Sequence, residues 1–331
     1  MNLIYFAFKY RYRFKDLNNF LNSRIYGKYI LLNFSGPFKY YLSKILILLK
    51  IGRAISCDGR PLIKNKSQGY NFFIRGTDLN IPTNLLDLDN NIVAIKHPLL
   101  ENNKIFQIYP INIKKNKMNV DIKIIFMSSI KLETNEEGSL FWKAHKEKIL
   151  NNFAILDDKH FWQNNLPNKS LLEINRFYRI TKTLLRFEIV TYLKKIYDKK
   201  FVLIGDDWKK YSIDSLKSNY NTKKNKKIYK GNICLDTGSL EGSSSLYPRA
   251  NQIIESGGLI LQSFQSDSKE IWKNLHDKIL FKNLSHLISL IEKLLNNKKY
   301  CFTLLQEISE NFRHSNKSIE KSLDKIFNIL N

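Results

Sequence analysis

Short apolar runs alternate with amphipathic stretches along the chain. Apolar runs bounded by turn formers predict buried strands, whereas apolar residues three and four positions apart predict helices. In the first third of the sequence, the predicted strands are 2–8, 29–34, 53–57, 71–75 and 92–96, and the predicted helices are 14–24 and 38–50. This alternation is typical of a doubly wound α/β sheet.

The same alternation resumes after a polar stretch, 112–121, that we interpret as a linker. The predicted strands beyond it are 122–127, 154–156, 201–204, 232–236, 259–261 and 279–281. The predicted helices are 140–151, 171–197, 249–256 and 284–296, with a helical tail over 302–330. A lysine cluster over 220–230 indicates a solvated loop. The sequence therefore predicts two domains, 1–118 and 119–331.

Composition places the chain among globular proteins with a sizeable core. Of its 331 residues, 43% are hydrophobic and 25% are charged, which is ordinary for a folded protein. The three cysteines, Cys57, Cys234 and Cys301, are far apart and show no metal-binding spacing. We interpret them as reduced thiols of a cytoplasmic protein, and we expect no bound metal.

The net charge of +24 has two interpretations. Attraction to a polyanion is one, with an anionic inner-membrane surface as the best use of the charge. Codon drift toward lysine is the other, because lysine greatly outnumbers arginine. The apolar run 45–49 is far shorter than a membrane-spanning helix. The sequence therefore predicts a cytoplasmic protein with peripheral membrane contact as an open alternative.

The stretch 228–272 is the most informative part of the chain. A buried strand leads into a polar loop, 237–245, and Pro248 suits the first turn of the helix that follows. Gly257 and Gly258 end that helix, and another strand comes next. Free amides at a helix N-terminus, together with the helix dipole, form a ready anion site.

Arg249 is the strongest candidate for a ligand contact in this stretch. A cation in the first turn of a helix opposes the helix dipole, so its placement makes sense if it faces an anion. Arginine binds phosphate through two N–H groups. A surface salt bridge is the alternative role.

The residues Arg249, Gln252, Gly257 and Gly258 resemble the R-x-x-E-x-x-x-x-G-G pattern of GT-B glycosyltransferases. The chain most resembles the spore-maturation-type branch, which has a "glycosyl transferases group 1" C-terminal domain. The resemblance covers roughly the C-terminal two-thirds of the chain. Gln252 stands where that family has a glutamate that holds the nucleotide ribose. Exostosin-like glycosyltransferases show a similar segment.

The resemblance implies a GT-B fold, in which two Rossmann-like α/β domains face a cleft. The N-terminal domain would bind the acceptor and the C-terminal domain the nucleotide sugar, with the last helix, 319–330, crossing back. No metal or cofactor is implied, because basic side chains and a helix dipole neutralise the diphosphate. The expected nucleotide-sugar-binding residues are Gly205, Ser245, Tyr247, Arg249, Gln252, Glu255 and Gly257.

Several of these residues have structural alternatives that the sequence leaves open. Gly205 follows a predicted strand and also suits a plain turn, and Tyr247 also suits the core. Glu255 could bind a hydroxyl or form a structural pair. Ser129 and Lys131 follow the first strand of the second domain, where a basic residue would stabilise the leaving diphosphate.

An inverting enzyme needs a general base on the acceptor side. Asp58, Asp78 and His97 lie at predicted strand ends there, and Asp58 is the expected catalytic residue beside Arg249. The predicted function is sugar transfer from a nucleotide sugar to a hydroxyl of a glycan or lipid-linked glycan. The alternatives are a non-catalytic glycan binder and a basic nucleic-acid-binding protein. Scattered lysines without a recognition motif argue against nucleic acid as a partner.

Overall fold

The computed structural model describes residues 2–8, 24–26, 29–35, 45, 53–56, 69–73, 91–93, 110, 113, 118–132, 135–217, 222–240 and 242–313. The chain divides into two compact units, and the first comprises Met1–Ile111 and Asn316–Asn331. The second comprises Asn112–Ser315. Each unit has its own sheet among the described strands.

The sheet of the first unit has six strands in the order β2-β3-β1-β4-β5-β6. The strands are β1 (Asn2–Phe8), β2 (Arg24–Tyr26), β3 (Tyr29–Ser35), β4 (Arg53–Ser56), β5 (Gly69–Phe73) and β6 (Asn91–Val93). All neighbouring pairs are parallel except β2 with β3. The five strands predicted for this unit are confirmed, with β5 beginning two residues earlier. The predicted helices 14–24 and 38–50 lie outside the described residues, apart from Arg24 in β2 and the helical Ile45.

The sheet of the second unit has five parallel strands in the order β11-β10-β9-β7-β8. The strands are β7 (Ile124–Met127), β8 (Phe201–Ile204), β9 (Ile233–Asp236), β10 (Leu259–Ser263) and β11 (Leu280–Phe281). Every residue of β9 and β10 is buried, as expected for parallel strands covered on both faces. The predicted α/β class with a parallel sheet is confirmed.

The parallel strands of both sheets are arranged in the same order. When the parallel strands are counted along the chain, the second strand lies at one side, next to the first. The third, fourth and fifth strands follow on the other side of the first strand. This is one of the two common orders of doubly wound α/β sheets. The two sheets therefore share their strand order, although the segments between their strands differ in length.

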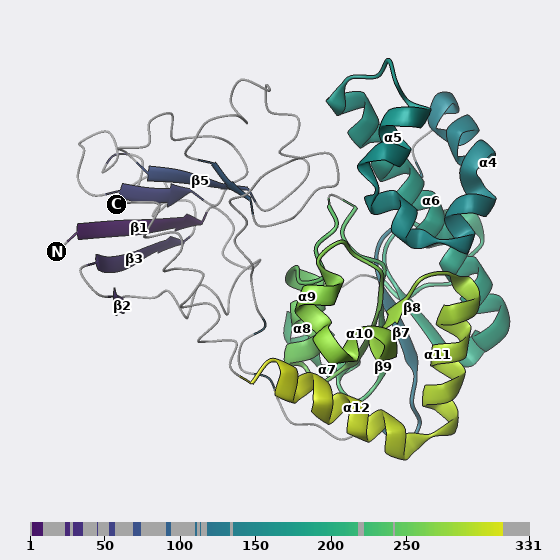
Figure 1. Cartoon of the computed structure of the whole chain (residues 1–331). Coiled ribbons are helices and arrows are strands. Elements are labelled where there is room, and N and C mark those ends of the chain that lie inside the picture. The colour runs from purple at the N-terminus through teal and green to yellow at the C-terminus, as the bar shows by residue number, and fades with distance from the viewer. Residues whose placement is uncertain are drawn as a thin grey trace. The chain divides into compact units, whose positions relative to one another are not determined.

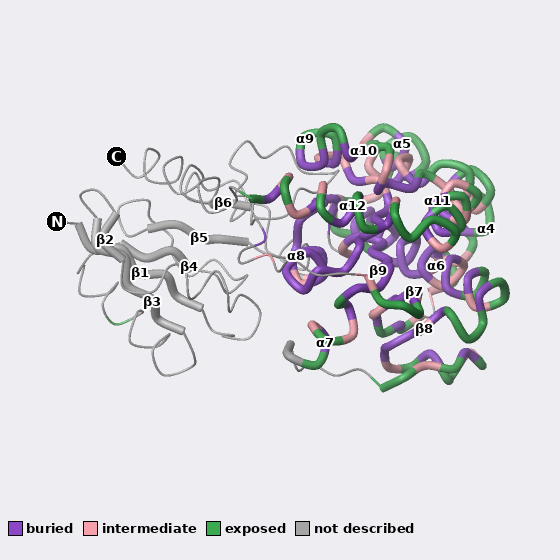
Figure 2. Tube along the Cα trace, turned by 90° about the horizontal axis from the view of Figure 1, so that it is seen from below, coloured by how far each residue is buried: buried purple, intermediate pink, exposed green. Residues whose placement is uncertain are grey.

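Helices cover both faces of the sheet in the second unit. They are α4 (Glu136–Asn151), α5 (Lys159–Asn165), α6 (Leu171–Tyr197), α7 (Thr222–Tyr229), α8 (Pro248–Glu255), α9 (Ser268–Trp272), α10 (His276–Ile279), α11 (Leu284–Asn296) and α12 (Lys298–Asn311). Figure 1 shows α8 and α11 on either side of the strands, and α4 and α5 with part of α6 gathered at one end. Strands β7 and β9 and most of α8 are buried, whereas α11 and α12 carry exposed faces (Figure 2).

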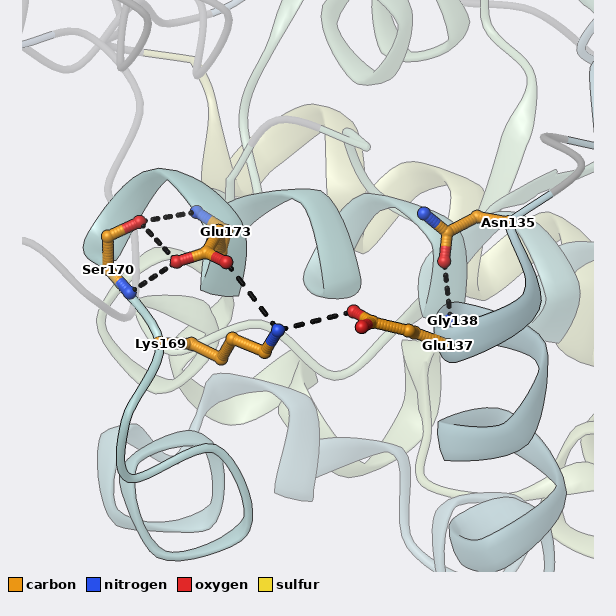
Figure 3. Close-up of polar contacts among 6 residues, drawn as sticks. All are labelled: Asn135, Glu137, Gly138, Lys169, Ser170 and Glu173. Atoms are coloured by element: carbon orange, nitrogen blue, oxygen red, sulfur yellow. Dashed lines mark hydrogen bonds and ion pairs between the residues drawn. The ribbon is translucent and has the colours of Figure 1, made fainter.

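Side-chain caps fix where the two longest helices begin (Figure 3). Asn135 accepts a hydrogen bond from the amide of Gly138 at 2.7 Å, which starts α4. Ser170 and Glu173 form a reciprocal capping box at the start of α6. Lys169 lies between the two helix starts, with its Nζ 3.2 Å from Glu137 and 3.5 Å from Glu173.

Three predictions for the second unit need comment. The lysine-rich stretch 220–230 is not a loop, because α7 spans Thr222–Tyr229 and buries Asn225 and Tyr229 while Lys224 and Lys227 are exposed. The predicted strand 154–156 is wrong, because Phe153–Asp157 is a 3-10 helix. The helical tail is confirmed over α12, while the expected crossing helix, 319–330, lies outside the described residues. The functional division at residue 118 stays a prediction.

Replacing Ser170 with alanine tests the start of α6. We expect Ser170→Ala to lower the free energy of unfolding by about 0.5–2 kcal/mol, because the cap of the N3 amide is lost. Urea denaturation followed by circular dichroism measures the change. Thr303→Ala, at an exposed position inside α12, is the control and should change stability by less than about 0.5 kcal/mol. Equal stabilities for the two variants would contradict the assigned cap.

Candidate functional site

The strand order marks one place on the second sheet as the expected ligand site. The chain passes from β7 to β8 on one side and then returns to β9 on the other side of β7. In open α/β sheets, ligands bind outside the carboxyl ends of the strands where this order reverses. In the second unit, that place lies outside Ser128, which follows β7, and Thr237, which follows β9.

Arg186 of α6 bridges the two strand ends at this place. Its Nη1 donates to Ser128 Oγ at 2.9 Å, and its Nε donates to Thr237 Oγ1 at 3.1 Å. Its Nη2 donates to the carbonyl oxygen of Gly238 at 3.2 Å. The side chain is only 4% exposed. Burial lowers the pKa of Arg186 to about 10, and the positive charge of Arg249 acts in the same direction.

A buried carboxylate, Asp236, ends β9 beside these arginines. Its Oδ1 accepts from the hydroxyl of Tyr247 at 2.6 Å and from the amide of Gly238 at 3.2 Å. Its Oδ2 accepts from Gln262 Nε2 at 2.7 Å. Asp236 lies within electrostatic range of both Arg186 and Arg249. Burial raises the pKa of Tyr247, so this residue stays a neutral hydrogen-bond donor to the carboxylate.

Arg249 lies in the first turn of α8, as predicted, and one of its nitrogens has no acceptor. The residue is half-buried, but its Nη1 is enclosed and has no hydrogen-bond partner among the residues that the structure describes. The guanidinium lies 5.9 Å from the ring centre of Tyr247. Burial alone would lower the pKa of Arg249, but Tyr247, Asp236 and Tyr229 together outweigh burial and raise it. A buried charged donor without an acceptor is unfavourable unless a ligand supplies one.

Lys182 adds a third cation, one turn before Arg186 on α6. It is 6% exposed, and its Nζ donates to the hydroxyl of Tyr178 at 2.9 Å and to the carbonyl oxygen of Gly242 at 3.0 Å. Within the described part of the chain, neither this lysine nor Arg186 or Arg249 forms an ion pair within 4.0 Å of a carboxylate. The site therefore concentrates positive charge.

The loop that leads into α8 is largely occupied by its own contacts. Ser245 donates its amide to Asp267 at 2.7 Å and its hydroxyl to Ser268 at 3.0 Å, and its carbonyl accepts from Gln262. Tyr247 is the N-cap of α8, and its side chain makes no capping hydrogen bond. The N-terminus of the helix therefore has no capping oxygen from this residue. Ser245 therefore has a structural role in the loop, and its role as a ligand contact stays a prediction.

The close packing of the backbone explains why residue 205 is a glycine. A Cβ built on it would lie 2.0 Å from the carbonyl oxygen of Ser128, so the ends of β7 and β8 approach too closely for any side chain. Its amide donates to the carbonyl of Leu216 at 2.9 Å. Ser129 and Lys131, after β7, are exposed, and the Ser129 hydroxyl accepts from the amide of Asp206.

The other predicted residues lie on α8, just after its C-terminal end, or in the first unit. Gln252 is half-buried on α8, and Gly257 ends the helix with a φ of 70°. Glu255 is 5% exposed, and its Oε2 lies 3.3 Å from Lys226 Nζ of α7, which favours the structural pair. Asp58, together with Asp78 and His97, lies outside the described residues.

Sequence reasoning missed Lys182, Arg186 and Asp236 as members of the site. A signal for the two cations was present, because both lie on the apolar face of α6 at the spacing of one turn. A charged residue among buried apolar positions has to find a polar partner, so such a pair indicates a buried polar site. For Asp236, the signal was its position at the carboxyl end of an otherwise apolar strand.

Comparisons with known proteins give little beyond this geometry. No protein-family model matches the sequence, and no curated protein matches it. Among solved structures, the S. aureus MnaA-UDP co-structure aligns with 94% of this chain and 91% of that chain. The identity is 10% and the TM-score is 0.38, a likeness too low to carry an argument.

Two further observations concern the described residues alone. No helix among them is long and apolar enough to cross a membrane. No group of three or more histidine, cysteine, aspartate or glutamate side chains among them has an arrangement that could hold a metal ion.

Replacing Gly205 with alanine separates its two possible roles. We expect Gly205→Ala to lower the free energy of unfolding by about 1–3 kcal/mol, because the backbone of Ser128 has to move away. Chemical denaturation measures the loss. Lys131→Ala, at an exposed position after β7, should change stability by less than about 0.5 kcal/mol. Unchanged stability in Gly205→Ala would contradict the close approach of the two strand ends.

Proposed function

We propose that the chain is a glycosyltransferase that takes its sugar from a nucleotide sugar. In this proposal, the diphosphate of the donor binds at the carboxyl edge of the second sheet. The acceptor is a hydroxyl of a glycan or a lipid-linked glycan. The observation that carries the proposal is the enclosed Nη1 of Arg249, which has no acceptor in the described part of the chain.

The charges around Arg249 support an anionic ligand. Arg249 and the buried Arg186 repel each other, and Asp236 is the carboxylate within range of both. Taking charges out of water is unfavourable unless each is paired and hydrogen-bonded. A diphosphate would neutralise this excess and would accept charge-assisted hydrogen bonds from the guanidinium groups. A neutral ligand would leave the repulsion in place.

The position of these charges supports binding of a nucleotide group in particular. They lie where the strand order of a doubly wound sheet reverses, and Arg249 lies at the positive end of α8. The loop before α8 is buried and held by hydrogen bonds to Asp267, Ser268 and Gln262. A rigid and preorganised set of donors can stabilise charge that develops on a leaving diphosphate. This is the role that we assign to Arg249 in sugar transfer.

The remaining parts of the mechanism come from the sequence resemblance. Gln252 would contact the nucleotide ribose, and Asp58 would act as the general base toward the acceptor hydroxyl. A non-catalytic glycan binder is the alternative, and one observation favours it. Glu255, the carboxylate on α8, is paired with Lys226, and Gln252 carries no charge, so a charged ribose contact from α8 is lacking.

Replacing Arg249 with methionine tests the proposal. Thermal shift with a panel of nucleoside diphosphate sugars should show stabilisation of the unmodified protein by at least one member. We expect Arg249→Met to weaken that ligand by about tenfold to a hundredfold, because one charge-assisted hydrogen-bonding group is lost. The ligand-free variant should be as stable as the unmodified protein, because Arg186 loses a repulsive neighbour.

Arg313→Met is the matched control. Arg313 is exposed near the end of the described chain and pairs with Glu310, so the variant makes the same charge change away from the site. Its affinity for the ligand should equal that of the unmodified protein. Equal affinity in Arg249→Met would contradict the proposed site. Release of nucleoside diphosphate with a glycan acceptor separates an enzyme from a non-catalytic binder.

A further inference from the structure

Lys182 is a buried amine whose two hydrogen-bond partners also bond to each other. Its Nζ donates to the Tyr178 hydroxyl and to the Gly242 carbonyl, but the Tyr178 hydroxyl itself donates to the same carbonyl at 3.0 Å. The two partners therefore remain bonded to each other without the lysine. An apolar side chain of similar length would fill the same space without the unfavourable burial of a charge.

The ammonium group also has donor capacity left over. An ammonium carries three N–H donors, and two of them have partners among the described residues. Asp157 is the carboxylate that attracts Lys182 most strongly, and Asp236 attracts it less. In the described part of the chain, Lys182 Nζ forms no ion pair within 4.0 Å with either of these two carboxylates. Among the residues that the structure describes, the third donor therefore has no acceptor.

Lys182 lies against the same loop as the other two cations. It contacts Gly242, whereas Arg186, one turn further along α6, contacts Thr237 and Gly238 at the start of that loop. Arg249 follows the end of the loop, in the first turn of α8. In the described part of the loop 237–247, which leaves out residue 241, cations from two helices thus contact the loop at two places and follow it at its end.

We propose that Lys182 is an anion-binding residue whose ammonium contacts a phosphoryl group seated on the loop 237–247, and that its deprotonation weakens this ligand at alkaline pH. The proposal builds on the proposed function, because it assigns a further residue to the same anion site. Nothing in the sequence resemblance points to this lysine. The observation that carries it is a buried amine whose two hydrogen-bond partners satisfy each other without it.

The charged and titratable groups around Lys182 set the direction of the pH effect. They are Tyr178 and Arg186 on α6, Asp157 before α5, and Asp236 at the end of β9. Burial and Arg186 lower the pKa of Lys182 to about 8, against the attraction of Asp157 and Asp236. Burial keeps the pKa of Tyr178 far above its ordinary value, so Tyr178 stays neutral. Lys182 is therefore the group that changes charge between about pH 7 and pH 9.

The ligand-free and ligand-bound proteins should respond to pH in opposite ways. Without ligand, the folded pKa lies below the unfolded value, so the folded state binds fewer protons. The stability contributed by this residue then rises as the pH increases from about 8 toward the ordinary lysine value. With an anion bound, loss of the proton removes an attractive charge, so the stabilisation by ligand falls over the same range.

Lys182→Met tests the proposal in thermal-shift titrations of the full chain. The probe is ADP-glucose. Its diphosphate keeps its charge and its base does not titrate across this range. The other nucleoside diphosphate sugars are tested after it. At about pH 7, we expect Lys182→Met to weaken the probe about tenfold to a hundredfold. The affinity of the unmodified protein should fall by up to about tenfold between pH 7 and pH 9, toward that of Lys182→Met.

Two further variants separate anion binding from a structural role. Lys195→Met removes an exposed lysine on the same helix and should keep the affinity and pH profile of the unmodified protein. Asp157→Asn removes the carboxylate that attracts Lys182 most, so it should lower the pKa of Lys182 further and move the loss of affinity to lower pH if Lys182 acts on the ligand. If Lys182 only balances Asp157, Lys182→Met will change the melting temperature without ligand but leave the affinity for the probe unaltered, which would overturn the proposal.

The failure of this inference can be told from the failure of the proposed function. Loss of affinity in Arg249→Met, together with unchanged affinity in Lys182→Met, would overturn the role of Lys182 alone. A flat pH profile in a protein that binds the probe would do the same. The absence of any stabilisation of the unmodified protein by every nucleoside diphosphate sugar would overturn both.

Discussion

The carboxyl edge of the second sheet depends on one buried carboxylate, that of Asp236. Two guanidinium groups lie within its electrostatic range, and a tyrosine, a glutamine and a backbone amide donate to it. Fixed donors satisfy the oxygens of a carboxylate in a low-dielectric interior, where each charge interaction is stronger than in water. Without Asp236, Arg186 and Arg249 would lack a shared counter-charge, and the loop before α8 would lose the Tyr247 contact that anchors it.

A rigid helix explains how positive charge can remain buried at this edge. Helix α6 is 27 residues long, begins with a capping box, and buries apolar residues along most of its length. Lys182 and Arg186 are therefore held by a helix that is stable for other reasons, so the burial of their charges is offset by packing elsewhere. The donors need little reorganisation when an anion arrives, which is the condition under which they stabilise a ligand or a transition state most.

Elements with a strong local signal could be predicted from the sequence, and contacts between distant elements could not. The apolar run of β1 and the periodicity of α6 gave the observed bounds, because burial of these residues decides their conformation. Pro248 and Gly257 marked the ends of α8 through their backbone preferences. The contact of Arg186 with Ser128 spans 58 positions and depends on which strands are neighbours, and no local pattern carries that information. The burial of Tyr229, which makes 222–229 a helix, has the same origin.

The bridge made by Arg186 also limits where a ligand can bind. In a doubly wound sheet, the ends of the first and third strands separate and leave a crevice, here between β7 and β9. Arg186 connects Ser128 on one side of this crevice with Thr237 and Gly238 on the other. A ligand that entered between the strand ends would have to break these three buried hydrogen bonds, which is unfavourable. An anion that lies above the bridge keeps them, and there it meets the enclosed nitrogen of Arg249 at the start of α8.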